Sequence, residues 1–190
     1  MGKDMIKLGL NLLIISAVAA LLLALTNSVT ADTIAKRSEE ANAEARKLVL
    51  DTAQTFELMS DAKVDNSKGV EVAEVYKALD GSGNVVGYTL KVLPSGYGGA
   101  IELMVGIDAT TNQVSGINVV SNSETPGLGA KATDPSFSDQ YKGKPTEALS
   151  VLKNGTPGDT EIIAISGATI TSSAVTDGVN AAIEVYNSLK

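Results

Sequence analysis

A β-hairpin is predicted by residues 70–93, which read VEVAEVYKALDGSGNVVGYTLKVL. Two runs rich in β-branched residues, 70–79 and 85–93, flank the glycine-containing turn 80–84. Such runs on either side of such a turn are typical of two antiparallel strands. In the second run, large apolar side chains alternate with smaller or polar ones. We therefore expect one face of this strand to be buried.

The β pattern continues beyond the hairpin, with further apolar runs at 100–107 and 114–120. In the first of these runs, Ile101 and Leu103 begin one apolar face, while Met104 lies on the other. Four consecutive strands joined by short turns imply a mainly antiparallel sheet. Helices are expected before and after it, so the predicted fold class is α+β.

The N-terminal region predicts a transmembrane helix. Residues 8–31 are 24 positions without a charge, and as a helix they would span roughly 36 Å, enough to cross a bilayer. Lys3 and Lys7 precede the run, so residues 1–31 are expected to be a single-pass anchor in the cytoplasmic membrane, with everything after them outside. The alternative is a secretory signal cleaved after the small residues 29–31, but the run is longer than the usual signal core of about 7–15 residues.

A stalk helix is expected over residues 32–60, between the anchor and a domain at 61–190. The region is rich in alanine and charge, and Ala41, Ala45 and Leu48 belong to a thin apolar stripe at helical spacing. We interpret its charges as a solvated face.

The composition excludes several classes of function. The chain has 15 Lys and Arg against 22 Asp and Glu, a net charge of -7, which argues against nucleic-acid binding. It has no cysteine and no histidine, which excludes iron–sulfur clusters, thiolate zinc sites, disulfides and Ser-His-Asp or Cys-His catalysis. Redox or transfer chemistry would have to come from carboxylates, hydroxyls, backbone dipoles or a bound cofactor.

The most informative segment for function is 166–172, SGATITS. It follows a predicted buried strand at 162–165 and precedes a terminal helix whose apolar face runs from Ala174 to Tyr186. Free backbone N–H groups at a helix start favour an anion, and small residues would let a phosphate approach the backbone. The alternative is an ordinary Ser/Thr N-cap, which these residues by themselves favour.

A second candidate segment is 124–129, ETPGLG, with Lys131 soon after it. Proline presets one turn dihedral, and glycine permits left-handed backbone or close approach to a ligand. By itself this pattern indicates a loop. Beside the 166–172 segment, its carboxylate, hydroxyl, glycines and lysine become candidates for lining a polar ligand.

Together these segments resemble the FMN-binding domain family. The resemblance is carried by SGATIT at 166–171, ETPGLG at 124–129 and GYGG at 96–99 running into a strand. In order, spacing and single N-terminal anchor, the chain is most similar to the G subunits of Rnf-type ferredoxin:NAD+ oxidoreductase complexes. The related C subunits of Na+-translocating NADH:quinone oxidoreductases carry the same domain on a typically longer chain. The resemblance covers essentially the whole sequence.

The resemblance implies a covalent FMN on Thr169, held by a phosphoester bond. A separate flavin transferase makes that bond with FAD as donor, and a helix start just beyond Thr171 and Ser172 would stabilise the phosphate. The remaining candidate flavin-site residues, most of them adjacent to the attachment point or in the two loops, are Ser166, Gly167, Ala168, Glu124, Thr125, Gly127, Leu128, Gly129, Lys131, Tyr97 and Gly98.

Two positions depart from the family pattern. Family members usually have an aspartate where this chain has Ile163, and often a histidine where it has Asn122. If that acid guides the transferase, attachment here would be slower or incomplete. Asparagine still donates and accepts hydrogen bonds, but it does not change charge near neutral pH.

The function implied by the resemblance is that of a one-flavin electron carrier on the outer face of the membrane. It would be a subunit of a Na+- or H+-translocating oxidoreductase, without a substrate pocket of its own, and its partners would be the other membrane and peripheral subunits, the flavin transferase and membrane lipid. One alternative keeps the flavin but serves quinone-linked or extracellular electron transfer. The other is a tethered binding domain without flavin.

Overall fold

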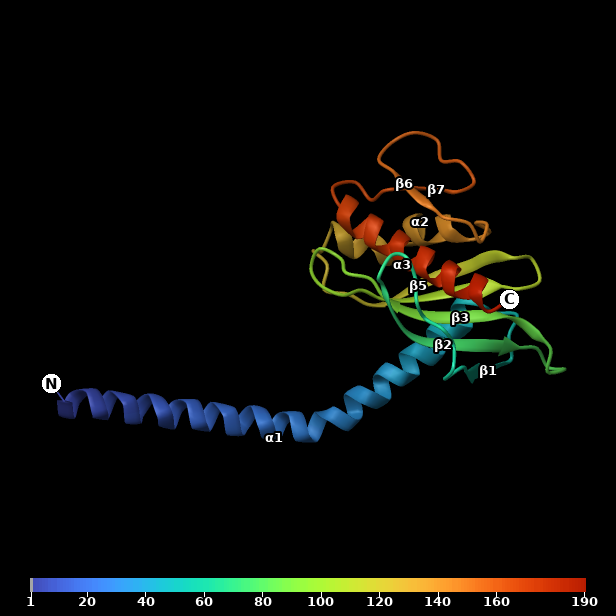
Figure 1. Cartoon of the computed structure of the whole chain (residues 1–190). Helices are drawn as coiled ribbons and strands as arrows, with labels where there is room; N and C mark the ends of the chain where they lie inside the picture. The colour runs from blue at the N-terminus through green and yellow to red at the C-terminus, as the bar shows by residue number, and fades with distance from the viewer. Residues whose placement is uncertain (1) are drawn as a thin grey trace. The chain divides into compact units, whose positions relative to one another are not determined.

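The structure, a computed structural model, describes residues 2–190, which form two compact units, one up to Ala41 and one from Asn42 to Lys190. Helix α1 (Gly2–Val49) opens the chain, a five-stranded sheet and a connection with two further short strands follow, and helix α3 (Thr169–Ser188) closes it (Figure 1). This order of helices around an antiparallel sheet confirms the α+β class.

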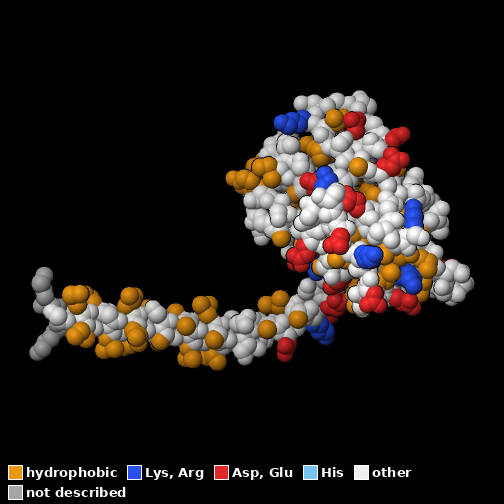
Figure 2. Space-filling view, in the orientation of Figure 1, with side chains coloured by type: hydrophobic (Ala, Val, Ile, Leu, Met, Phe, Trp, Pro, Cys, Tyr) orange, Lys and Arg blue, Asp and Glu red, His pale blue; other side chains and the backbone are white. Residues whose placement is uncertain are grey.

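Helix α1 provides the membrane-length segment. It is the one helix among residues 2–190 that is long and apolar enough to cross a membrane, and Figure 2 shows apolar side chains along most of its visible face, with charges gathering toward its C-terminal end. Within the apolar run, the hydroxyls of Thr26 and Thr30 donate to the carbonyls of Leu22 and Thr26, at 2.8 and 2.9 Å. These bonds leave neither hydroxyl unpaired, as a lipid environment demands.

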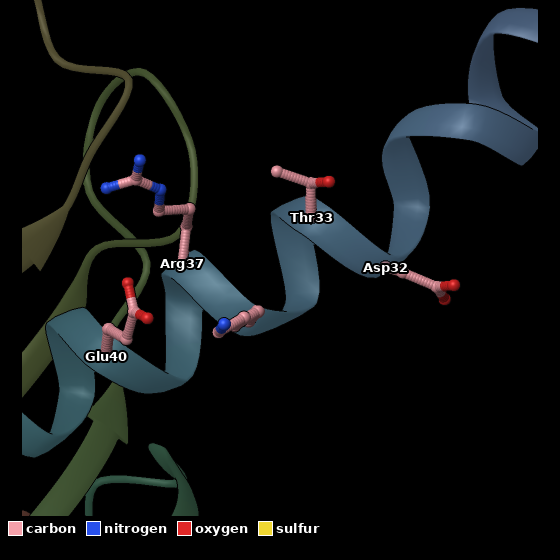
Figure 3. Close-up of a pocket in the computed structure, with 5 residues that line it drawn as sticks. Asp32, Thr33, Arg37 and Glu40 are labelled. Atoms are coloured by element: carbon pink, nitrogen blue, oxygen red, sulfur yellow. The ribbon is translucent and has the colours of Figure 1, made fainter.

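The polar stretch of α1 confirms the interpretation of its charges as a solvated face only in part. Asp32, Arg37 and Glu40 are exposed, but Arg46 is 6% exposed and pairs with Glu74 at 3.5 Å. In Figure 3 the side chain of Asp32 points away from those of Arg37 and Glu40, so the charges do not converge on a common point. The predicted end of the stalk at residue 60 is wrong. The helix ends at Val49, and part of the range assigned to the stalk is strand β1 (Thr55–Leu58).

The sheet has five antiparallel strands in the order β1-β2-β3-β4-β5. The four predicted runs correspond to the strands that follow β1, which are β2 (Glu71–Leu79), β3 (Val85–Leu93), β4 (Glu102–Asp108) and β5 (Gln113–Ser121). In the predicted turn, Oδ1 of Asp80 accepts from the N–H groups of Ser82 and Asn84, at 2.8 and 2.9 Å. Of this sheet only β1 was missed, because its four residues fall inside the range expected to be helical.

Helix α3 covers one face of the sheet and forms the main core with it (Figure 1). Leu90 and Leu103 from the sheet and Val175 and Val179 from the helix are all fully buried in this cluster. Burial of this apolar surface is the dominant stabilising term of the domain.

The opposite face of β4 packs against the last turns of α1. Met104 is fully buried against Ala45 and Val49, so this strand is covered on both faces. Gly106 permits the close approach, because a Cβ there would overlap the carbonyl oxygen of Val49. The hydroxyl of Ser115 donates to that same carbonyl, which is one of the helix-end acceptors without an intrahelical partner.

A compact connection leads from β5 to α3. It contains the short helices η1 (Gly129–Thr133), α2 (Pro135–Ser138) and η2 (Asp139–Tyr141), and then β6 (Ser150–Leu152) and β7 (Glu161–Ile163). The predicted strand at 162–165 is β7, which pairs in parallel with β6. The expected helix start beyond Ser172 is wrong, because α3 begins at Thr169, immediately after the turn at Gly167.

Candidate functional site

A pocket of about 540 Å³ lies where three segments of the domain meet. The segments are the loop 96–99, the loop 124–129 and the start of α3. Its lining residues are Tyr97, Glu124, Thr125, Leu128, Gly129, Gly167, Ala168, Thr169, Ile170 and Thr171. The tertiary structure therefore brings together most of the candidate residues that the sequence distributes over about 75 positions, and adds Ile170.

Thr169 is the first residue of α3, and its side chain is half-buried at the pocket. The N-cap residue is Ala168, and no side chain caps the helix. The Thr169 hydroxyl makes no hydrogen bond to any of residues 2–190. The alternative of an ordinary Ser/Thr N-cap is therefore not what the structure contains, and the hydroxyl stays available for chemistry.

Glu124 is buried beneath the pocket, with 6% of its surface exposed. Its Oε1 accepts from the backbone N–H of Gly98 at 2.8 Å, and its Oε2 accepts from the hydroxyl of Thr171 at 2.6 Å. One carboxylate therefore contacts all three segments of the pocket, its own loop included.

Five candidate residues lie outside the lining. Ser172 is fully buried; its hydroxyl accepts from the N–H of Ile165 and donates to the carbonyl of Ala168, both at 2.9 Å, which holds the turn before α3. Gly98 contributes its N–H to Glu124. Gly127 adopts a left-handed φ of 79° in its loop. The other two, Ser166 and Lys131, line a separate hollow of about 220 Å³.

The rim of the pocket is apolar and accessible. Tyr97, Leu128 and Ile170 are 72%, 44% and 59% exposed, and each comes from a different one of the three segments. Sequence reasoning missed Ile170, although its place between Thr169 and Thr171 in the motif would have identified it. Exposed apolar side chains that gather at a pocket are typical of a binding site.

A second hollow, of about 330 Å³, adjoins the pocket at Thr169 and Ile170. Ser173 and Asp177, further along α3, form part of its wall. Asp177 pairs with Lys68 at 2.9 Å, and the hydrogen bond and charge of this carboxylate raise the pKa of the lysine. Thr169 therefore borders both hollows.

The two positions that depart from the family pattern, Ile163 and Asn122, each make hydrogen bonds within the domain. Gln140 binds the backbone of Ile163 in both directions, accepting from its N–H at 2.8 Å and donating to its carbonyl at 3.2 Å. Asn122 accepts from the N–H of Glu124 at 3.0 Å, which orients the backbone just before that carboxylate. Asn122 therefore supports the pocket without a histidine.

The fold and the pocket define an α+β domain with one largely apolar pocket beside the Thr169 hydroxyl. Residues 96–184 match the FMN-binding domain, and residues 1–49 match the RnfG N-terminal region. Over 98% of its length the chain is 45% identical to the G subunit of the Na+-translocating ferredoxin:NAD+ oxidoreductase complex of Acetobacterium woodii, covering 94% of that protein. It is 41% identical to the G subunit of the ion-translocating oxidoreductase complex of Methanosarcina acetivorans, over 96% of this chain and 95% of that one.

These matches extend over both the helix and the domain. The chain therefore belongs to the family of G subunits of ion-translocating ferredoxin:NAD+ oxidoreductase complexes. Among solved structures, the C subunit of the Na+-translocating NADH-quinone reductase of Parabacteroides distasonis aligns over 82% of this chain and 94% of its own, with a TM-score of 0.60 and 21% identity. That likeness establishes the shared fold.

Proposed function

We propose that this chain carries one FMN, covalently attached to Thr169, and relays electrons through it within a membrane-bound, ion-translocating ferredoxin:NAD+ oxidoreductase complex. The observation that carries the proposal is the Thr169 hydroxyl, which borders the pocket and has no hydrogen-bond partner among residues 2–190. Family membership, with 45% identity to a G subunit, supports the assignment to such a complex.

The residues of the pocket fit a flavin mononucleotide. The volume of the pocket, about 540 Å³, lies within the range of roughly 300–1,000 Å³ typical of cofactor sites. The first N–H groups of α3 have no intrahelical acceptor, so a phosphate on Thr169 would meet donors and the positive end of the helix dipole. Tyr97, Leu128 and Ile170 would provide apolar contacts to a flat aromatic ring system. The bound flavin would supply the redox chemistry.

We assign attachment to a second enzyme, and the absence of histidine and cysteine, two groups that commonly take part in activating a hydroxyl or thiol, supports this assignment. We assign that role to a flavin transferase that uses FAD. Oγ1 of Thr169 would form a bond to the phosphorus of the FMN half of FAD, the bond between the two phosphates would break, AMP would leave, and the hydroxyl proton would pass to a base of the transferase. The half-buried position of Thr169 at the rim gives such an enzyme access.

Helix α1 supports a location in the cytoplasmic membrane. Lys3 and Lys7 lie before the uncharged run, which favours a cytoplasmic N-terminus and a domain on the outer side. The flavin would then exchange electrons with the other membrane and peripheral subunits of the complex at that surface, and lipid would surround the helix.

The deciding experiment is in-gel flavin fluorescence after denaturing electrophoresis, with the full chain co-expressed with a flavin transferase. The wild type and Thr169→Ser should fluoresce, because both present a hydroxyl, and Thr169→Ala should not. Ser173→Ala, one turn further along the same helix, is the matched control and should fluoresce like the wild type. A dark wild-type band would contradict the proposal and favour a binding domain without flavin.

Partnership is tested separately by purification of the tagged chain from its native membrane. Recovery of the other subunits of the oxidoreductase with a fluorescent chain would support the complex. A fluorescent chain that purifies without them would instead favour a role in quinone-linked or extracellular electron transfer.

A further inference from the structure

Glu124 occupies a position that a simple cofactor contact does not explain. It is 6% exposed, and both of its carboxylate oxygens are already engaged by donors of the protein, Gly98 N–H at 2.8 Å and Thr171 Oγ1–H at 2.6 Å. Burying a carboxylate is unfavourable unless hydrogen bonds replace its hydration. Here those bonds come from two segments that lie on either side of Glu124 in the chain.

The backbone around Glu124 is shaped to admit its side chain. A Cβ at Gly129 would overlap Oε2 of Glu124 and stand 2.5 Å from Oγ1 of Thr171. A Cβ at Gly96 would overlap Oε1, and one at Gly98 would overlap the carbonyl oxygen of Ser123. The absence of side chains at these three glycines is therefore what lets the loops close around the carboxylate.

The first turn of α3 is hydrogen-bonded to the same carboxylate through Thr171. No side chain caps this helix, so the negative charge of Glu124 near its first turn is the favourable interaction that a capping residue would otherwise supply. Thr171, which Glu124 binds, lies two residues after Thr169. A helix that is held at Thr171 presents Thr169 in a defined direction, since side chains two residues apart point to different sides of a helix.

We propose that Glu124 is a positioning residue, whose carboxylate fastens the loop 96–99 and its own loop to the first turn of α3. It keeps the pocket in shape and turns the Thr169 hydroxyl toward the flavin transferase. The part of this inference that concerns flavin rests on the proposed function. The hydrogen-bonded connection that Glu124 makes between Gly98 and Thr171, which we call the joint, does not rest on that function. It is testable in protein that carries no flavin.

The first experiment measures hydrogen exchange in the full chain with Thr169→Ala, which removes flavin from every sample. Adding Glu124→Ala should speed exchange of the Gly98 amide and of the first turn of α3 by at least about tenfold, the loss expected for hydrogen bonds to a charged group. Glu124→Gln keeps an acceptor for Gly98 and should give a smaller increase. Unchanged exchange at Gly98 in Glu124→Ala would overturn the proposal.

The matched control is Glu102→Gln, which removes the same charge from a glutamate that pairs with Lys91 at 3.1 Å, outside the pocket lining. Exchange at Gly98 should not change in this variant. An equal increase in both variants would attribute the effect to charge alone and would overturn the assignment to Glu124.

The second experiment measures the initial rate of flavin attachment in chains that retain Thr169. Glu124→Ala and Thr171→Val should each slow attachment about tenfold or more. The double variant should be no slower than the slower single variant, because both substitutions break one joint. Losses that multiply would contradict a shared joint.

A midpoint potential of the attached flavin provides a readout that destabilisation elsewhere would not change. It should shift in Glu124→Ala and stay at the wild-type value in Glu102→Gln; an identical potential in all three proteins would count against positioning of the flavin by Glu124. If the wild type accepts no flavin at all, the proposed function fails, while the exchange data still decide whether Glu124 forms the joint.

Discussion

The pocket side and the interior side of the start of α3 carry similar hydroxyl residues and use them differently. On the pocket side, Thr169 is half-buried and its hydroxyl has no partner among residues 2–190. Thr171 also lines the pocket, but it is 2% exposed and its hydroxyl donates to Glu124. On the interior side, Ser172 donates to the carbonyl of Ala168 and Thr176 to the carbonyl of Ser172. A run of hydroxyl residues that looks uniform in the sequence therefore divides into one free group and several structural ones.

Helical geometry accounts for this division. Residues four apart share a helix face, so Thr169 and Ser173 point to the exposed side, while Ser172 and Thr176 point inward. On the interior side, Tyr141 completes the network with a 2.7 Å hydrogen bond to Thr176. Burial, rather than residue type, therefore separates the proposed attachment site Thr169 from the hydroxyls that hold the start of the helix. Four predictions test this difference.

The largest effect is expected when Thr169 and Thr171 are each replaced by valine. Thr169→Val should abolish flavin attachment completely while the melting temperature stays close to that of the wild type, because its hydroxyl bonds to none of residues 2–190. Thr171→Val should lower stability and leave slow attachment. Intact-mass spectrometry and thermal unfolding measure the two properties. A stable, fully flavinylated Thr171→Val would remove the distinction between the two sides.

A smaller but still large effect is expected from Gly129→Ala. Its Cβ would overlap Glu124, and we expect a loss of about 3 kcal/mol in the free energy of unfolding, as for other overpacked sites. Gly127→Ala is the matched control: its φ is 79°, but nothing lies within 4 Å of the added Cβ, so only backbone strain of about 1 kcal/mol applies. Urea titration of both variants checks the difference. Equal losses would mean that strain, not the carboxylate, restricts position 129.

The next largest effect, on the free energy of unfolding, is expected from a comparison of the neighbouring residues Ser172 and Ser173. Ser172→Ala leaves the buried N–H of Ile165 without its acceptor and should reduce the free energy of unfolding by about 2 kcal/mol. Ser173→Ala should change it by about 0.5 kcal/mol at most, because this half-buried hydroxyl has no bond to residues 2–190. Chemical denaturation measures both. The comparison would be broken if Ser173→Ala were the more destabilising substitution.

The smallest effect on stability is expected at the rim. Tyr97 is 72% exposed, so Tyr97→Ala should change the free energy of unfolding by about 0.5 kcal/mol at most. If its ring covers the flavin, quenching of flavin fluorescence by iodide should nevertheless increase. Unchanged quenching would place the flavin away from this side of the pocket.

Much of the fold could be predicted because its signals are local. The hairpin at 70–93 and the strands β4 and β5 follow from alternation and turn residues close in sequence. The missed strands lack such signals: β1 has four residues at the edge of the sheet, and β6 has only three residues, which pair with the predicted strand β7. Their existence depends on partners that sequence periodicity does not reveal.

Prediction of the candidate site had a similar limit. The motifs at 124–129 and 166–172 named most of the residues that line the pocket, and the resemblance singled out Thr169. Ser172 was also predicted to be a flavin-site residue, although its hydroxyl is hydrogen-bonded to Ile165 and Ala168 within the turn before α3. Glu124 was expected to contact flavin, and the added finding is that both its oxygens already bind protein groups. Residue types alone do not say which polar atoms are satisfied.

By itself, the sequence determined the membrane-length helix and the hairpin, since these follow from neighbouring residues, and the absence of histidine and cysteine excluded chemistry that needs either side chain. Only the tertiary structure decided which hydroxyl at the start of α3 is free. Thr171 is engaged by Glu124, which lies 47 residues before it and reaches it because two loops with glycines at positions 96, 98 and 129 close around one carboxylate. Burial and hydrogen bonding are properties of the assembled core, so no local pattern could have assigned them.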